Sequence, residues 1–213
     1  MLVDPNLFVR PFLYGEAVLS SKIEGTTSDL RQLVLFEAQP EDEVETPQRA
    51  DAREVFNYVR ALNYGLGRLD ELPVCLRLIR EVHARLLERV RGQDKRPGEF
   101  RTIQNYIGLK NRPLQEARFI PPPVREMGPC LHDLEAFIND PRPGLPFLVK
   151  LALIHYQFEA VHPFVDGNGR IGRLLNTLLL CAAGVLPQPL LYLSAFFERH
   201  RTEYMDRLLE VSR

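Results

Sequence analysis

The stretch HPFVDGNGRIGR, residues 162–173, places a histidine, an aspartate and two arginines between two strongly apolar runs. The run before it is LVKLALIHYQFEAV (148–161), and the run after it is LLNTLLLCAA (174–183). Their apolar periodicity predicts helices over 146–161 and 169–183. The two helices would pack in the core, so the polar residues between them need a chemical explanation.

The glycines of this stretch suit an anion-binding loop. Backbone N–H groups at the start of a helix have no intrahelical partner, and the helix dipole favours negative charge there. Gly167 and Gly169 allow left-handed geometry and close approach of a phosphate. Arg170 lies in the first turn, where a cation is unfavourable unless an anion lies beside it, and Arg173 follows one turn later on roughly the same face. We therefore predict a phosphate site at this helix N-terminus.

Asp166 and His162 add two further groups that phosphate chemistry uses. A carboxylate beside a phosphate is repelled unless a divalent cation bridges them, and Mg²⁺ typically binds one or two carboxylates plus substrate phosphates. A histidine titrates near neutral pH, which suits a general base. The sequence thus predicts Asp166 as a Mg²⁺ ligand and His162 as the base.

Residues 162–173 resemble the signature of Fic-domain proteins, HxFx(D/E)GNGRxxR, with every fixed position present. The resemblance covers most of the chain, because GEFRTIQNYIG (98–108) and ARFIPPPV (117–124) are similar to the segment around that family's β-hairpin flap. It implies an all-α Fic fold with a small β-hairpin flap. It also implies a protein adenylyltransferase, which transfers AMP from ATP to a Ser, Thr or Tyr hydroxyl of a target protein.

The resemblance implies a role for each position of the signature. His162 would deprotonate the target hydroxyl, which attacks the α-phosphate with loss of pyrophosphate, and Asp166 would hold Mg²⁺ at the α- and β-phosphates. The other phosphate-binding residues would be Gly167, Asn168 and Gly169 around the anion, and Arg170 and Arg173 at the outer phosphates.

The substrates would approach from two further segments. The flap, about residues 101–123, would align an extended segment of the target protein by strand addition. Tyr204 would stack on the adenine, while Met205 departs from the two adjacent tyrosines that relatives often have.

A second motif lies near the N-terminus, in LSSKIEGT (19–26). Taken alone, it is typical of a helix C-terminus with a stop at Gly25. Beside the Fic signature it resembles the family's inhibitory motif, (S/T)xxxE(G/N), with Ser20 and Glu24 at the fixed positions. The implied role of Glu24 is a salt bridge to Arg173 that pulls this arginine off the γ-phosphate, so we expect an auto-inhibited protein.

The whole chain reads as one compact, mainly helical unit. We assign 1–45 to an N-terminal segment with the inhibitory helix and 46–213 to the Fic core domain. Further helices are expected over 47–66, 74–90 and 124–139 and from about residue 194 to the C-terminus, with a hairpin formed by 101–107 and 116–120. The last helix ends without a stop signal, which leaves open a missing C-terminal domain.

The bulk composition excludes several classes of function. The 213 residues carry a formal net charge of −1, which disfavours nucleic-acid binding through this domain. The three cysteines form no paired motif, which is typical of free thiols in a reducing compartment. With no signal peptide and no membrane-spanning stretch, we expect a cytoplasmic protein. A homo-oligomer remains open.

Four alternatives stay open at this point. On the same scaffold, the protein would remove AMP from a modified target, with Glu24 positioning water, or would transfer another phosphate-containing group. A non-enzymatic regulator would use nucleotide occupancy to control partner binding. The fourth alternative is a di-iron site. His155, Glu159 and His162 share a helix, and Glu159-x-x-His162 has the spacing of a di-iron ligand pair. Such a site needs a second Glu-x-x-His pair, which the sequence lacks.

Overall fold

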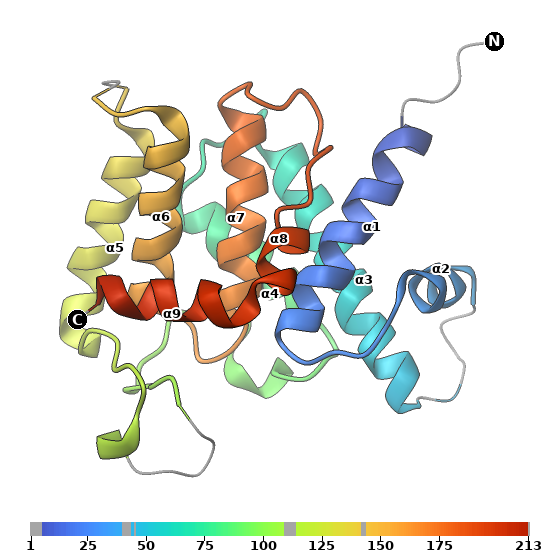
Figure 1. Cartoon of the computed structure of the whole chain (residues 1–213), viewed down its shortest axis with the longest axis horizontal. Coiled ribbons are helices and arrows are strands. Elements are labelled where there is room, and N and C mark those ends of the chain that lie inside the picture. The colour runs from blue at the N-terminus through green and yellow to red at the C-terminus, as the bar shows by residue number, and fades with distance from the viewer. Residues whose placement is uncertain (1–5, 40–43, 45, 109–113, 142–143, 213) are drawn as a thin grey trace.

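The computed structural model describes residues 6–39, 44, 46–108, 114–141 and 144–212, which form a bundle of helices (Figure 1). In chain order the helices are α1 (Asn6–Ile23), α2 (Leu30–Ala38), α3 (Pro47–Arg68), α4 (Leu76–Leu86), α5 (Val124–Asn139), α6 (Phe147–Val161), α7 (Asn168–Ala182), α8 (Ser194–Arg199) and α9 (Arg201–Val211). Two short 3-10 turns, η1 (Gln93–Lys95) and η2 (Leu114–Glu116), lie between α4 and α5. Within these described parts, no helix is long and apolar enough to cross a membrane.

The helix α7 forms the centre of the bundle. Its residues are buried almost without interruption from Asn168 to Leu180, and it contacts α1, α3, α4 and α6. The buried residues of α7 include polar side chains, such as Arg173 and Asn176, as well as apolar ones. In Figure 1, α5 and α6 flank it on one side, and α9 runs across the ends of α5, α6 and α7. The start of α7 is therefore held inside the protein, next to α1 and α9.

The all-α prediction is confirmed, and the structure corrects two of its details. The expected hairpin consists, in the described part of the segment, of one isolated antiparallel bridge between Ile107 and Phe119. Around it, side chains bind carbonyls that a longer ladder would use: Arg101 donates to Pro122 O and Gln104 to Pro121 O. Prolines also lack the N–H that a strand needs. Residues 109–113, at the tip of the predicted flap, lie outside the described residues.

The last predicted helix is two helices. The chain leaves helical geometry at His200, whose φ and ψ are −109° and 34°, so that α8 ends there and α9 starts in a new direction. This change of direction brings α9 to the cavity described below.

A close approach between α3, α4 and α7 at Gly65 gives a first prediction. A Cβ added at Gly65 would lie 3.0 Å from both methyl groups of Leu178 and 3.3 Å from Val82. Overpacking costs typically about 1–3 kcal/mol, and the better helix propensity of alanine offsets about 1 kcal/mol of it. We expect Gly65→Ala to lower the free energy of unfolding by about 1 kcal/mol.

Gly67 on the same helix is the matched control, because a Cβ there meets no atom of the described residues within 4 Å. Gly67→Ala should be neutral or stabilising in urea denaturation. Equal effects of the two substitutions would show that α3 does not approach its neighbours as closely as described.

Candidate functional site

The loop between α6 and α7 contains two left-handed residues. α6 ends at His162, with φ of 47°, and α7 begins after Gly167, with φ of 79°. Glycine adopts this geometry freely, whereas it costs a histidine about 1–2 kcal/mol. Asn168 closes the loop from inside, since its Oδ1 accepts from Phe164 N and its Nδ2 donates to Phe164 O, each at 2.8 Å. Asn168 therefore braces the loop itself.

His83 of α4 packs against the loop and binds its backbone. The sequence alone did not connect this residue to the site. Its ring stacks on Phe164 with centroids 3.7 Å apart. Its Nε2 donates to Asp166 O at 3.0 Å, and its Nδ1 accepts from Gly98 N at 2.8 Å. Burial lowers the pKa of His83 to about 4, so at neutral pH the ring keeps the uncharged form that both bonds require.

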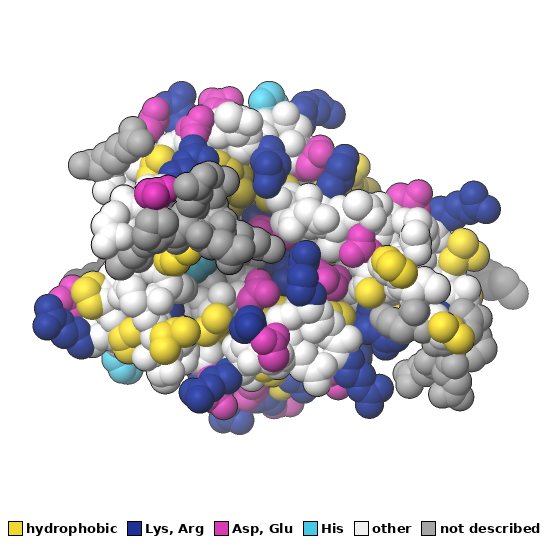
Figure 2. Space-filling view, turned by 90° about the horizontal axis from the view of Figure 1, so that it is seen from below, with side chains coloured by type: hydrophobic (Ala, Val, Ile, Leu, Met, Phe, Trp, Pro, Cys, Tyr) yellow, Lys and Arg dark blue, Asp and Glu magenta, His cyan; other side chains and the backbone are white. Residues whose placement is uncertain are grey.

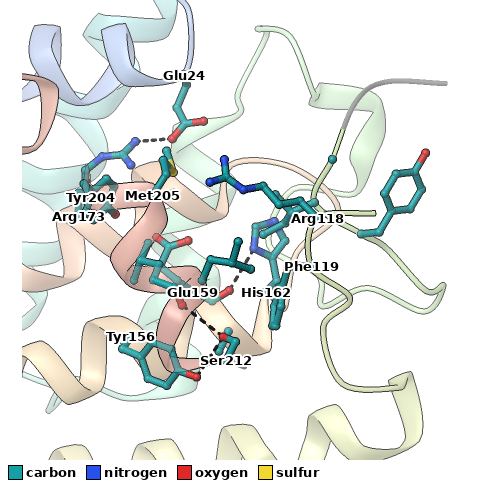
Figure 3. A pocket seen from close by; sticks show the side chains of 17 residues that line it. Glu24, Arg118, Phe119, Tyr156, Glu159, His162, Arg173, Tyr204, Met205 and Ser212 are labelled. Carbon is teal, nitrogen blue, oxygen red and sulfur yellow. Dashed lines mark hydrogen bonds and ion pairs between the residues drawn. The ribbon is translucent and has the colours of Figure 1, made fainter. Parts of the chain in front are cut away.

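The loop opens on a cavity of about 440 Å³ between α6, α7, α9, the flap and the end of α1. Figure 3 shows Glu24 and Arg173 pointing toward one another on one side of it, with His162 beside Phe119 of the flap on the other. Segments more than a hundred residues apart in the sequence therefore meet here.

His162 lines this cavity as a neutral imidazole. Burial lowers its pKa to about 4, so the ring is uncharged at pH 7. Its Nδ1 donates to Glu159 O at 3.3 Å. The proton on Nδ1 leaves a lone pair on Nε2, and such a nitrogen can take a proton from a substrate.

Arg173 and Glu24 form an ion pair at the cavity wall. Arg173 Nη2 lies 2.6 Å from Glu24 Oε1, and the guanidinium also donates to Ser20 Oγ at 2.9 Å and to Ser20 O at 3.0 Å. Arg173 is 1% exposed and Glu24 33% exposed. Burial acts to raise the pKa of Glu24, but the Arg173 charge outweighs it and the pKa is lowered. Glu24 is thus ionised and covers the arginine.

The first turn of α7 has room for this contact only because residue 169 is a glycine. A Cβ at Gly169 would lie 2.3 Å from Glu24 Oε1 and 3.0 Å from Arg173 Nη1. The sequence predicted that a phosphate approaches this glycine closely. In the structure, the group that approaches it is the carboxylate of Glu24.

Arg170 does not reach the cavity. It is buried against α3, where its Nη1 lies 3.2 Å from Glu54 Oε2. Glu54 also pairs with Arg91 at 3.3 Å. The two arginines of the signature, predicted on roughly the same face, therefore point to different helices in the described structure.

Tyr204 lines the cavity from α9 but is held by its own neighbours. Its ring packs on Phe197 with centroids 4.5 Å apart, and its hydroxyl donates to His155 Nε2 at 2.8 Å. His155 in turn donates from Nδ1 to Gly172 O at 3.2 Å. Burial lowers the pKa of His155 to about 4 and raises that of Tyr204. These bonds use both nitrogens of His155, so the di-iron alternative has no support from this residue.

The metal prediction rests on Asp166 alone. Its Oδ1 accepts from Gly167 N at 2.6 Å, and its Oδ2 lies near Gly92. Among the residues that the structure describes, no group of three or more His, Cys, Asp or Glu side chains is placed to hold a metal ion. Asp166 does not line the cavity, but it is half-buried beside the predicted phosphate site. Its carboxylate there fits Mg²⁺, which binds through one or two carboxylates plus substrate phosphates.

Glu159 is a buried acid at the cavity, and its Oε1 has no hydrogen-bond partner among the residues that the structure describes. Burial raises its pKa from 4.5 to about 7. The unfolded chain releases this proton at lower pH than the folded chain, so Glu159 costs stability as the pH rises from 4.5 to 7. Because Glu159→Gln carries no such proton, its stability relative to wild type should grow over this window, by at most about 3 kcal/mol.

Urea denaturation of both proteins at pH 5 and pH 8 measures this difference. Other titrating groups cancel in the comparison because both proteins contain them. A difference that is the same at both pH values would contradict the burial of a protonated Glu159.

One face of the molecule carries side chains of both charges. Figure 2, which views the molecule from below, shows Lys and Arg side chains interspersed with Asp and Glu.

Comparison with known proteins gives consistent matches. A sequence model described as the Fic/DOC family matches residues 73–180, and one described as the Fic/DOC family N-terminal region matches residues 1–67. Protein adenylyltransferase Fic of Drosophila grimshawi is 30% identical over 173 residues, which are 78% of this chain and 32% of that protein. The Aedes aegypti protein of the same name is 30% identical over 195 residues, 87% of this chain and 34% of that one.

The fold is also found among solved structures. A Fic family protein from Desulfovibrio desulfuricans superposes with a TM-score of 0.74 at 23% identity, covering 98% of this chain and 59% of that one. Of the two curated relatives described above, the chain spans only about a third of the length.

Proposed function

Since the chain belongs to the Fic/DOC family, we propose that it is a protein adenylyltransferase, which transfers AMP from ATP to a Ser, Thr or Tyr hydroxyl of a target protein. The observation that carries this proposal is the cavity that brings a neutral His162 together with Arg173 and the N-terminus of α7. A general base, a cation and a helix N-terminus are the groups that nucleophilic attack on a phosphate needs.

The reaction follows from these groups. Nε2 of His162 takes the proton of the target hydroxyl while the hydroxyl oxygen attacks the α-phosphorus. The new P–O bond forms as the bond to the β-phosphate oxygen breaks, and pyrophosphate leaves. Asp166 would hold Mg²⁺, and the bound ion would supply positive charge to neutralise the phosphates. The backbone of Gly167, Asn168 and Gly169 binds the anion, and positioning supplies much of the catalysis.

The two arginines have different roles in this proposal. Arg173 holds the outer phosphates once Glu24 has moved away. Arg170, buried on Glu54, supports the phosphate site through the first turn of α7 and adds its positive charge at a distance. Tyr204 forms the wall against which the nucleoside lies.

The contacts of Glu24 and Ser20 support auto-inhibition. Both bind the Arg173 guanidinium, and Glu24 lies over Gly169, where a phosphate would lie. In this state ATP cannot place its outer phosphates on Arg173.

The target segment would add to the flap near Ile107 and Phe119, which line the cavity.

Removal of AMP is the second candidate function. Glu24 lines the same cavity as His162, so its carboxylate is placed to orient a water molecule toward a bound AMP-modified side chain. The two directions have different substrates, and therefore they can be separated by product analysis.

The test incubates the protein and its Glu24→Gly variant with Mg²⁺ and ATP, and then measures intact mass and nucleotide products. Adenylyl transfer adds AMP to the protein and releases pyrophosphate. Addition of a different phosphate-containing group would contradict the proposal. In a second reaction with AMP-modified protein, release of AMP by the wild type but not by Glu24→Gly would favour the second candidate.

A further inference from the structure

Two side chains connect the catalytic loop to the flap. Arg101 donates from Nε to His162 O at 3.1 Å, and Asn105 donates from Nδ2 to the same oxygen at 3.2 Å. Asn105 also donates to Phe164 O at 3.0 Å. Both donors come from the segment that leads into the flap, so the backbone of the general base is held from the flap.

Arg101 acts as the C-terminal cap of α6. The last carbonyls of a helix have no intrahelical donor, and the helix dipole makes this end negative. The guanidinium bonds to His162 O and, at 3.5 Å, to Val161 O, both at this end. Arg101 N also donates to Pro163 O at 2.8 Å. Arg101 is 2% exposed, and burial lowers its pKa.

The same guanidinium also holds both branches of the flap. Arg101 Nη2 donates to Pro122 O at 2.6 Å on the returning branch, and Nη1 donates to Ile103 O at 3.4 Å on the outgoing one. These branches pair at Ile107 and Phe119, which line the cavity. One buried cation therefore connects the flap to the end of α6.

The left-handed geometry of His162 makes these bonds matter. A histidine with φ of 47° adopts a conformation that its surroundings must maintain. Arg101 and Asn105 both bind the carbonyl of this residue, so they determine the direction in which its Cα–Cβ bond leaves the backbone.

We propose that Arg101 and Asn105 are positioning residues that orient the His162 imidazole and transmit the position of the flap to it. A target segment that adds to the flap would then also align the base. This inference rests on the proposed AMP transfer and deepens it.

The experiment uses the Glu24→Gly protein as parent and adds Asn105→Ala. Asn105 is half-buried, so the variant should fold. A displacement of about 1 Å in a catalytic group costs on the order of 100-fold in rate, so we expect kcat to fall roughly 10- to 100-fold. The Kd for ATP should stay within about twofold, since Asn105 does not line the cavity.

Asn139→Ala is the matched control. Asn139 also donates from Nδ2 to two carbonyls, Val74 O and Glu135 O, but it lies at the C-terminal end of α5, whereas the flap joins the N-terminal end. It should leave kcat unchanged. Arg101→Lys keeps the positive charge but loses the fork of donors. Its kcat should therefore be lower than that of the parent.

Ring resonances of His162 by NMR give a readout that does not need activity. In Asn105→Ala they should shift and their pH titration should change, whereas in Asn139→Ala they should match the parent. If kcat and these resonances are the same in both variants, the positioning role is overturned. A parent that transfers no AMP would refute the proposed function, and the resonances would still decide the role of Asn105.

Discussion

Glu24→Gly is expected to transfer AMP roughly 5- to 150-fold faster than the wild type, which is the change that a typical coupling free energy between two sites produces. In the structure, Arg173 is held by Glu24 Oε1 at 2.6 Å and by two oxygens of Ser20. Removing Glu24 leaves a buried guanidinium without its counter-charge, and an unpaired buried charge is strongly unfavourable. The phosphates of ATP then become the partner of Arg173, and the Oε1 that crowds Gly169 is gone.

Intact mass after incubation with Mg²⁺ and ATP measures this increase. Glu198→Ala is the matched control, because Glu198 of α8 pairs at 2.8 Å with Lys22 of α1, two residues before Glu24, but does not line the cavity. We expect it to label like the wild type. If Glu24→Gly and wild type modify themselves at equal rates, the inhibitory role of Glu24 is wrong.

His162→Ala in the Glu24→Gly background is expected to lose AMP transfer by about 10²- to 10⁴-fold, the usual contribution of a general base. The imidazole is neutral at pH 7, with Nδ1 bonded to Glu159 O, so Nε2 is the free acceptor. Alanine offers no acceptor at this place. ATP binding should be largely intact, because in the proposed reaction the imidazole acts on the hydroxyl and not on the nucleotide.

Calorimetric ATP binding and intact mass together measure the two effects. His200→Ala serves as the control, since His200 is partly exposed at the joint of α8 and α9 and lies outside the cavity. Retained transfer in His162→Ala would remove this residue from the role of base. A cellular function that persists without His162 would instead support a nucleotide-sensing regulator.

The sequence was sufficient for features that depend on neighbours along the chain. The apolar periodicity predicted α5 at its observed bounds and α6 and α7 within one residue. The glycines predicted a left-handed turn, which Gly167 adopts. The flap was predicted less well, since two strands were expected and one bridge is found among the described residues. Within the flap itself, the side chain of Arg101 binds Pro122 O, a carbonyl of the opposite branch, and the periodicity of a strand does not show such a bond.

The supporting residues of the site had no signal in the sequence. In the sequence, His83 is one of five histidines and Glu54 is one of 28 acidic residues. Their partners, Asp166 and Arg170, are 83 and 116 residues away. Such pairs form because α3 and α4 pack against the start of α7, and no local pattern encodes this.

The sequence by itself determined the helices, the loop that starts α7, and the chemical groups that this loop carries, because helix formation and backbone geometry depend on residues within a few positions. Only the tertiary structure decided which partner each group meets. Arg170 and Arg173 lie one turn apart on one helix, yet the first is directed to Glu54 of α3 and the second to Glu24 after α1. The choice depends on which helices enclose the start of α7, and packing of the whole core determines that.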